Sequence, residues 1–292
     1  MTNETGYEWW SESDFGIGVR TGIKARLLHE GSTQFQEMRI FEHPLMGRVL
    51  VLDDIIQTTT SDEFFYHEMF VRVPFVGHPR FNDPDRKLDV LIIGGGDGGI
   101  LREVLRYPQV QRVTMVEIDG EVIEFCNEHL GFQGNYDDPR VELIIGDGAA
   151  YVAEAAAEVG PDTFDHCIVD STDPGGPSMV LYTPEFHEQV RALLKSDGSM
   201  VRHMGIGFHH HATYRPILTE IRDIFPSMQV YRNNVPAYVG GDMAFACATK
   251  DGHRVDDPQA DDPGRFYNAE IHRASFAMSE WWKQNYLPAP RR

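Results

Sequence analysis

The stretch that decides the fold runs from residue 88 to 119 and reads LDVLIIGGGDGGILREVLRYPQVQRVTMVEID. An apolar run ends in a glycine-rich turn, an amphipathic segment follows, and a second apolar run, Val113–Val116, ends at Glu117. This order predicts the nucleotide-binding half of a doubly wound sheet. Asp97 is unusual for a phosphate-binding turn, because its carboxylate would repel a phosphate. The turn therefore predicts a nucleoside ligand that carries a cation.

Composition limits the classes of function. The 292 residues are 41% hydrophobic, which is enough for one large or two smaller cores. Net charge is −19, which disfavours nucleic-acid binding and either attracts cations or only aids solubility. The sequence has no apolar run of about 18 residues and no signal-peptide pattern, so we expect no membrane span. Three scattered cysteines without a CxxC pair favour a cytoplasmic protein over a disulfide framework or a zinc site.

Residues 1–82 are predicted to form an N-terminal domain built as a β-hairpin or meander with one short helix. Asp62 or Ser61 is the expected N-cap of that helix, and Pro74 its expected end. The stretch 78–86 is rich in Pro, Asn and Asp and reads as a linker. The expected strands are Gly22–His29, Gln36–Glu42 and Arg48–Leu52.

Residues 83–292 are predicted to form a Rossmann-like catalytic domain, because strand and helix patterns alternate there and predict a parallel sheet covered on both faces. The fold class is α/β, a methyltransferase-like doubly wound sheet after a small N-terminal β domain. One or two further strands are expected within 227–250, and a terminal helix over 269–286. The expected strands are 88–93, 112–117, 141–145, 165–170 and 198–203, and the expected helices are 99–106, 120–129, 148–159, 184–195 and 212–225.

Acidic residues stand at or just after the ends of four successive predicted strands, where ligands bind in such sheets. Capping of the following helices explains one such acid, but four in succession favour a binding site. These acids are Asp97, Glu117 with Asp119, Asp147, and Asp170 with Asp173.

Each acid suits a part of a cationic nucleoside. Glu117 lies about twenty residues after the glycine turn, where a carboxylate accepts ribose hydroxyls. Asp147, with the backbone of Gly148, suits an adenine amine, and it also suits an N-cap. Asp97 and the pair Asp170/Asp173 suit ammonium or sulfonium groups. An alkylammonium has a pKa near ~10, so a carboxylate can bind the cation and then accept its proton as a general base.

The run His209–His211 does not predict a metal site, because three consecutive side chains point in different directions and no HExxH pattern accompanies them. We expect a polar loop or a helix start there. No metal and no redox cofactor is expected anywhere in the chain.

Seven motifs together resemble the spermidine synthases, which are polyamine aminopropyltransferases, over nearly the whole chain. The resemblance implies transfer of an aminopropyl group from decarboxylated S-adenosylmethionine, a co-substrate, to a diamine, usually putrescine. The products are then spermidine and methylthioadenosine, and the assembly a homodimer or homotetramer. The motifs are LDDIIQTTTSDEFFYHEM, LIIGGGDGG, MVEID, GDG, DSTDPGGP, NNVPAYVGG and YNAEIHRASF.

The resemblance also implies roles for single residues. Asp97 is expected to bind the aminopropyl ammonium of the donor, Glu117 its ribose, and Asp147 with Gly148 its adenine. Asp170 is expected to accept the proton. The remaining implied contacts are Gln36 and Pro177 with the donor, and Gln57, Tyr66, His67, Asp173 and Tyr238 with the acceptor amine.

Several positions depart from the family pattern. Asp54 replaces a glycine, His203 a glutamine and Val239 an aromatic residue or proline, while Asp242 is either a loop acid or a tunnel carboxylate. These departures leave the acceptor open among putrescine, cadaverine, agmatine and a triamine. The sequence also does not decide whether a loop at 174–178 closes over the site. Two further alternatives are a methyltransferase that uses intact S-adenosylmethionine and a non-catalytic polyamine-binding protein.

Overall fold

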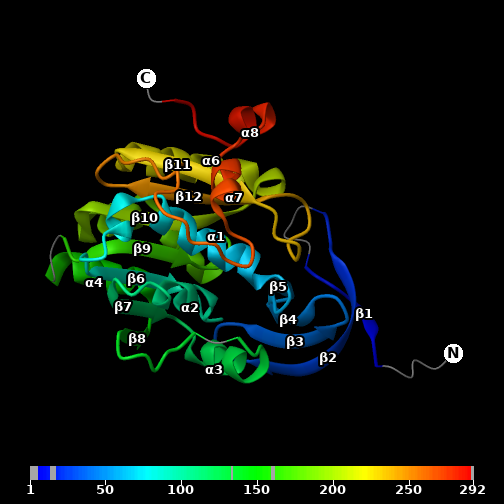
Figure 1. Cartoon of the computed structure of the whole chain (residues 1–292). Helices are drawn as coiled ribbons and strands as arrows, with labels where there is room; N and C mark the ends of the chain where they lie inside the picture. The colour runs from blue at the N-terminus through cyan, green and yellow to red at the C-terminus, as the bar shows by residue number, and fades with distance from the viewer. Residues whose placement is uncertain (1–5, 14–17, 133, 159–161, 291–292) are drawn as a thin grey trace.

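The computed structural model describes residues 6–13, 18–132, 134–158 and 162–290, without the side chains of Phe81, Asn82, Glu158 and Pro177. Within it the N-terminal part is an antiparallel meander whose strands lie in sequence order (Figure 1). The three predicted strands are confirmed, and the first and last were not predicted because they are short. The strands are β1 (Glu8–Ser11), β2 (Gly22–Ser32), β3 (Glu37–His43), β4 (Gly47–Leu52) and β5 (Ile55–Thr59).

A tight turn joins β4 to β5. Asp53 and Asp54 have φ values of +48° and +62°, so both adopt the left-handed conformation of a type I′ hairpin turn. Aspartate tolerates this conformation better than most side chains. Asp53 Oδ1 accepts the N–H of Glu37 at 2.9 Å, and Asp54 forms an ion pair with Arg39. The replacement of the family's glycine by Asp54 therefore leaves this turn unchanged.

Helix α1 (Glu63–Val76) follows β5 and has Gly77 as its C-cap. The prediction that Pro74 ends the helix is wrong. Proline removes an intrahelical hydrogen bond, but so near the end the loss is small, and Pro74 is itself buried in the core. Asp62 stands at the N-cap position without a capping bond, since its carboxylate binds the Thr59 hydroxyl at 2.5 Å and the Ala237 N–H at 2.6 Å.

The larger sheet has seven strands in the order β11-β12-β10-β9-β6-β7-β8. Five of them run parallel, whereas β12 is antiparallel to both β10 and β11. The expectation of a parallel sheet is therefore wrong for β12, which follows β11 through a loop instead of a crossover helix, whereas β11 points in the same direction as the five parallel strands. The strands are β6 (Leu88–Gly94), β7 (Val110–Glu117), β8 (Val141–Ile145), β9 (Phe164–Asp170), β10 (Leu194–Ile206), β11 (Ser227–Asn233) and β12 (Met243–Thr249).

Helices cover both faces of this sheet. One core joins the sheet to α1 and α2, and the other joins it to α4, α5 and α6. The predicted terminal helix is two short helices, each started by a capping side chain, Asn268 or Ser279. The helices after α1 are α2 (Gly99–Leu105), α3 (Gly120–His129), α4 (Gly148–Glu158), α5 (Pro184–Leu193), α6 (Gly207–Ile224), α7 (Ala269–Ser275) and α8 (Glu280–Asn285), with 3₁₀ turns η1 (Pro79–Asn82) and η2 (Gly176–Tyr182).

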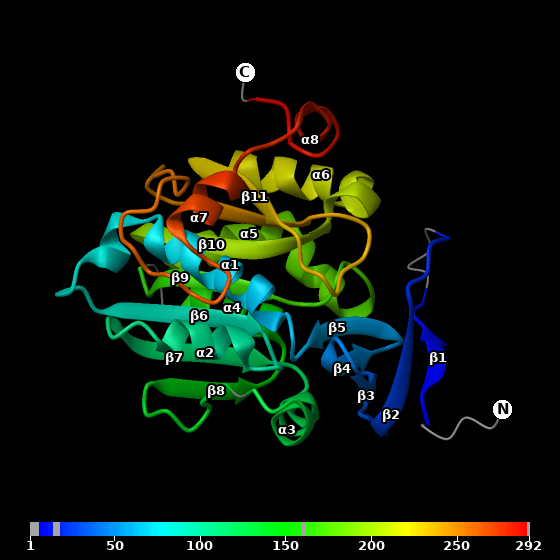
Figure 2. The same cartoon turned by 45° about the vertical axis from the view of Figure 1, so that its right-hand side comes forward.

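The small sheet lies beside one end of the larger sheet in both views (Figures 1 and 2). Met38, Ile40 and Leu50 pack against α3, which ties the two sheets together. Helix α1 precedes the domain boundary expected at residue 82 but contributes to the core of the larger sheet, and that boundary stays a prediction. Among the described helices, none is both long enough and apolar enough to cross a membrane.

Candidate active site

A cavity of about 610 Å³ lies where the small sheet meets the ends of β6, β7 and β9. This volume is within the usual range for a small-molecule site. The cavity brings together every predicted site residue whose side chain is described, whereas the side chain of Pro177 lies outside the described part. The lining includes Gln36, Gln57, Tyr66, His67, Asp97, Glu117, Asp147, Gly148, Asp170, Asp173 and Tyr238.

The glycine turn after β6 lies directly against the end of β9. Gly94 has φ +82°, and a Cβ there would lie 2.0 Å from the carbonyl oxygen of Asp170. The N–H of Gly95 donates to the same oxygen at 2.9 Å. Only glycine permits this approach. The close packing brings the strand end that carries Asp170 beside the turn that carries Asp97.

Asp97 is held from two sides. Its Oδ1 accepts the N–H of Gly99 at 2.8 Å, and its Oδ2 lies 3.2 Å from Nε2 of His67. Nδ1 of His67 lies 2.6 Å from Oε2 of Glu63. Since ionised carboxylates only accept hydrogen bonds, both ring nitrogens carry protons and the ring is an imidazolium.

Charge stabilises this imidazolium. Burial lowers the pKa of His67, but the carboxylates of Asp97 and Glu63 outweigh burial and raise it to about 10. Burial also opposes ionisation of Glu63, yet His67 and Arg102 lower its pKa to about 2. Both nitrogens of His67 are thus engaged by protein carboxylates, and its expected contact with the acceptor amine stays a prediction.

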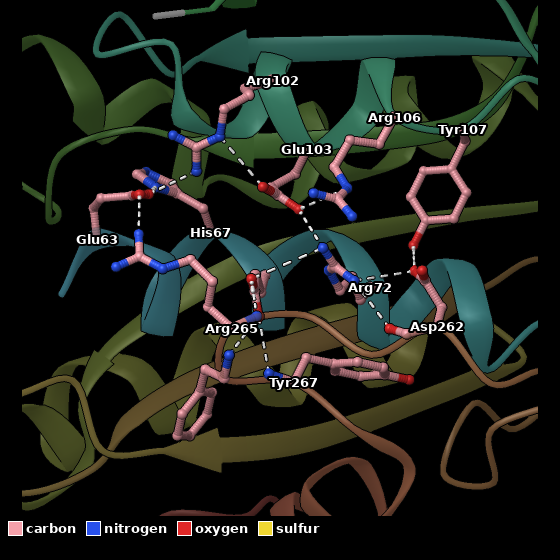
Figure 3. A network of polar contacts seen from close by, with 12 residues as sticks. Glu63, His67, Arg72, Arg102, Glu103, Arg106, Tyr107, Asp262, Arg265 and Tyr267 are labelled. Atoms are coloured by element: carbon pink, nitrogen blue, oxygen red, sulfur yellow. Dashed lines mark hydrogen bonds and ion pairs between the residues drawn. The ribbon is translucent and has the colours of Figure 1, made fainter. Parts of the chain in front are cut away.

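A buried polar network continues from Glu63 along α1 (Figure 3). Arg102 Nη2 donates to Glu63 at 2.7 Å and its Nε to Glu103 at 3.3 Å. Arg72 donates to Glu103 at 3.0 Å and lies 3.3 Å from Asp262. The network fixes α1 against α2 on one side and the C-terminal segment on the other.

Glu68 anchors the same C-terminal segment. Its buried carboxylate accepts the backbone N–H groups of Arg265, Phe266 and Tyr267 at 2.8 to 2.9 Å. It also lies 3.8 Å from Arg72. The helix that carries two cavity residues is therefore held in place by bonds to a segment almost two hundred positions away.

Glu117 lines the cavity at the end of β7. Burial raises its pKa to about 7, against the hydrogen bond that its Oε1 accepts from the N–H of Asp119 at 3.0 Å. Asp119 caps α3 and accepts the side-chain amide of Gln36 at 2.8 Å. Asp119 thus binds Gln36, which lies just before β3, through its side chain and Glu117 through its backbone.

Asp147 combines a capping role with a place at the cavity. Its Oδ1 accepts the N–H groups of Ala149 and Ala150 at 2.8 and 3.3 Å, so the capping alternative is correct. A Cβ on Gly148 would lie 2.5 Å from a methyl of Ile93. Glycine therefore permits the helix start to approach the strand at the cavity wall.

Asp170 ends β9 and receives the hydroxyl hydrogen of Tyr66 at 2.6 Å. Burial, then the nearby Asp97 carboxylate, raise the pKa of Asp170 to about 6, although Tyr66 and His67 oppose the shift. A carboxyl with a pKa close to neutrality is suited to take up and release a proton near pH 7.

Tyrosines from separate elements form the other end of the cavity. Tyr66 and Tyr238 meet edge to face, with ring centroids 6.0 Å apart. The Tyr238 hydroxyl donates to the carbonyl oxygen of Gln57 at 2.5 Å. Asp173 accepts the hydroxyl of Tyr214 on α6. Tyr214 was not predicted, because the pattern of α6 marks it only as a core residue.

The structure settles two alternatives left by the sequence. Asp242 pairs with Arg232 and does not line the cavity, so it is not a tunnel carboxylate. The run His209–His211 lies in the first turn of α6, as a helix start, and no group of metal ligands occurs among the described residues. Glu12 lines the cavity and accepts the N–H of Ile56 at 2.9 Å, a site role that no sequence motif indicated.

The sequence matches two family profiles, the spermine/spermidine synthase domain over residues 63–257 and the spermidine synthase tetramerisation domain over 8–60. The chain belongs to the spermidine synthase family. Polyamine aminopropyltransferase 1 of Pseudomonas aeruginosa is 41% identical over 91% of this chain and 93% of the relative. The polyamine aminopropyltransferase of Moorella thermoacetica is 38% identical over 97% of each chain.

Solved spermidine synthases share the fold. One, in complex with the transition-state analogue AdoDATO, has a TM-score of 0.87 and 35% identity, covering 96% of this chain and 94% of the other. The spermidine synthase of Thermotoga maritima has a TM-score of 0.85 at 35% identity, with the same coverage. This member of the spermidine synthase family is therefore an aminopropyltransferase with the architecture expected from its sequence.

Proposed function

We propose that this aminopropyltransferase transfers the aminopropyl group of decarboxylated S-adenosylmethionine to putrescine and forms spermidine and methylthioadenosine. The observation that carries the proposal is the meeting of Asp97 and Asp170 in one cavity that also contains Glu117 and Asp147. Two carboxylates suit the two cations that must react, and the other two suit a nucleoside. The similarity to polyamine aminopropyltransferases supports the same reaction.

The donor is proposed to lie along the strand ends. Glu117 accepts the ribose hydroxyls, and Asp147 with the backbone of Gly148 binds the adenine edge. Asp97 binds the ammonium at the end of the aminopropyl chain. Gln36 and Pro177 complete the donor contacts. Intact S-adenosylmethionine carries a carboxylate near this ammonium, which Asp97 would repel, so the geometry disfavours methyl transfer.

The acceptor is proposed to enter between Tyr66, Tyr238, Gln57 and Asp173. Asp170 takes a proton from its ammonium, and the freed nitrogen lone pair attacks the methylene next to sulfur. The carbon–sulfur bond breaks, and its electrons neutralise the sulfonium as methylthioadenosine leaves. The protein aligns the two groups and offsets their repulsion, and the sulfonium itself activates the carbon, so the step draws on no metal or redox cofactor.

The assembly is proposed to be a homodimer or homotetramer formed through the small sheet, whose profile is named for tetramerisation. β1 is an edge strand, and Trp9 on it is 74% exposed. An exposed edge with a large apolar side chain favours pairing with another chain. The free, buried cysteines Cys126, Cys167 and Cys247 agree with the proposed cytoplasmic location.

The test is a panel of diamines and triamines incubated with decarboxylated donor, with products identified by mass. We expect spermidine from putrescine and one methylthioadenosine per transfer. Parallel reactions replace putrescine with cadaverine, agmatine or spermidine, and a stronger signal from one of them would overturn the assigned acceptor. Methyl transfer from intact donor, or amine binding without release of methylthioadenosine, would overturn the proposed function.

A further inference from the structure

The segment between α3 and β8 lies against the glycine turn that carries Asp97. Within this segment, buried Gly134 meets Gly98 of the turn backbone to backbone. A Cβ on Gly134 would lie 2.9 Å from both the Cα and the carbonyl oxygen of Gly98, which is closer than such atoms approach. The two chains therefore touch at a place where a side chain on either residue would push them apart.

The hydroxyl of Tyr136 adds a hydrogen bond to this contact. It donates to the carbonyl oxygen of Gly96 at 3.1 Å. Burial, and then the charge of Asp97, raise the pKa of the Tyr136 hydroxyl, so it stays protonated and keeps its donor near pH 7. Tyr136 is not among the described residues that line the cavity, so it reaches the turn without touching a ligand there.

This bond acts on the central peptide of a β-turn. The N–H of Gly98 donates to the carbonyl oxygen of Gly95 at 2.9 Å, so Gly96 and Asp97 occupy the two central positions. Neither of them has a positive φ, as a type I turn requires, whereas a type II turn has a positive φ at its second central residue. The two types differ by a rotation of the central peptide, which carries the Gly96 carbonyl. The bond from Tyr136 therefore favours type I and the present direction of Asp97.

The far end of the same segment is fixed to α2. Arg140 donates to both carboxylate oxygens of Asp138, at 2.8 and 2.9 Å. It also donates to the carbonyl oxygen of Leu105, the last residue of α2, at 3.1 Å. Since α2 begins at Gly99, directly after the turn, the segment is bonded near both ends of this helix. These bonds hold Tyr136 in place beside the turn.

We propose that Tyr136 is a positioning residue for the aminopropyl donor and acts through the Gly96 peptide on the carboxylate of Asp97. The inference rests on the proposed function, in which Asp97 binds the ammonium of the donor. The N–H of Gly99 holds Oδ1 of Asp97 at 2.8 Å, but it does not fix the peptide before Asp97. Without the Tyr136 hydroxyl, this peptide is free to rotate toward type II and to move the carboxylate away from the ammonium.

A double-mutant cycle tests whether Tyr136 acts through Asp97. Tyr136→Phe removes only the hydroxyl, and calorimetry with decarboxylated donor alone should show a dissociation constant raised roughly 3- to 10-fold, the effect of one lost hydrogen bond. In the Asp97→Ala background the same change should be less than about 1.5-fold, because the positioned carboxylate is absent. In turnover assays the KM for putrescine should stay within about twofold, since Tyr136 positions only the donor.

Two further variants separate positioning from stability. Tyr231→Phe is the matched control, because the buried Tyr231 hydroxyl also donates to a backbone carbonyl at 3.1 Å, that of Met69, and Tyr231 is not among the described cavity residues. It should leave the donor constant within about 1.5-fold. Gly134 has no positive φ, so Gly134→Ala tests the backbone contact alone. Its Cβ would displace Gly98 and should raise the donor constant roughly 5- to 100-fold.

Each outcome decides the question. An unchanged donor constant in Tyr136→Phe would refute the positioning role. The same fold-change with and without the Asp97 carboxylate would show that Tyr136 acts independently of Asp97, and would also refute it. Equal losses of donor affinity in Tyr136→Phe and Tyr231→Phe would show a general loss of stability instead of positioning. Absence of methylthioadenosine release by the unsubstituted enzyme with any amine would refute the proposed function itself.

Discussion

Asp170→Asn is the most direct test of the chemistry in the cavity. The substitution keeps an oxygen that can accept the Tyr66 hydroxyl, which lies 2.6 Å from the Asp170 carboxylate, but it removes the proposed proton acceptor. Loss of a positioned general base typically lowers a rate 10²- to 10⁴-fold, which corresponds to about 2.7 to 5.5 kcal/mol of barrier. We expect kcat to fall by a factor within this range.

The pH profile makes this prediction specific. The pKa of Asp170 is about 6, so its carboxylate form increases as pH rises through 6. In the unsubstituted enzyme kcat/KM for putrescine should therefore rise over that range, and the asparagine variant should lose this limb. Release of methylthioadenosine, followed between pH 5 and 9, is a suitable assay.

Folding is not expected to confound the result. The folded-state pKa of Asp170 is raised, so its contribution to stability is present below the unfolded pKa and is lost as pH rises through about 6. A neutral asparagine has no such loss near pH 7, and the affinity for methylthioadenosine should be unchanged. A variant that retains more than about a tenth of the kcat, or that keeps the acidic limb, would refute Asp170 as the base.

The remaining predictions concern binding and stability. Asp97→Asn should raise the donor KM roughly 10- to 100-fold. It should also shift the acidic limb of the kcat/KM profile to lower pH, because Asp97 raises the pKa of Asp170. An unchanged donor KM or an unmoved acidic limb would contradict these roles. The affinity of the unsubstituted enzyme for methylthioadenosine should decline below pH 7, where Glu117 becomes protonated. Calorimetry should show that Glu117→Gln lacks this decline, and a variant with the same pH dependence as the unsubstituted enzyme would contradict the ribose role. Glu68→Ala leaves three backbone N–H groups without this partner, the one of Tyr267 buried, and should lower the free energy of unfolding by about 1 to 3 kcal/mol in urea, while exposed Glu270→Ala should change it by less than about 0.5 kcal/mol; equal losses would contradict the anchoring role.

Local sequence patterns predicted most of the catalytic sheet. The glycine turn and the acids after the strands are encoded by neighbouring residues, and the parallel sheet then brings them to one edge. Asp97, Glu117, Asp147 and Asp170 line one cavity for this reason. The family resemblance supplied the residues of α1 and Tyr238, since a buried tyrosine in a site has the same local pattern as one in the core.

Long-range pairing was not predictable in the same way. The antiparallel direction of β12 depends on its contacts with β10 and β11, and the alternation of earlier elements favoured a parallel strand. Helix α1 continues through Pro74 because the helix is buried in the core, and local helix propensity gives no information on burial. The bonds from Glu68 to Tyr267 join residues 199 positions apart, so no motif records them.

The structure also gives a physical reason for a carboxylate in the glycine turn. Arg102, Glu63, His67 and Asp97 form a buried series of alternating charge that ends at the cavity. Arg102 and Glu63 offset each other, and His67 and Asp97 do the same, so the series is neutral overall while its exposed end is negative. An ammonium bound at Asp97 continues the alternation, whereas a phosphate would place two negative groups in contact. The charges fixed behind Asp97, on α1 and α2, therefore favour a cationic ligand at a turn whose backbone alone would favour an anion.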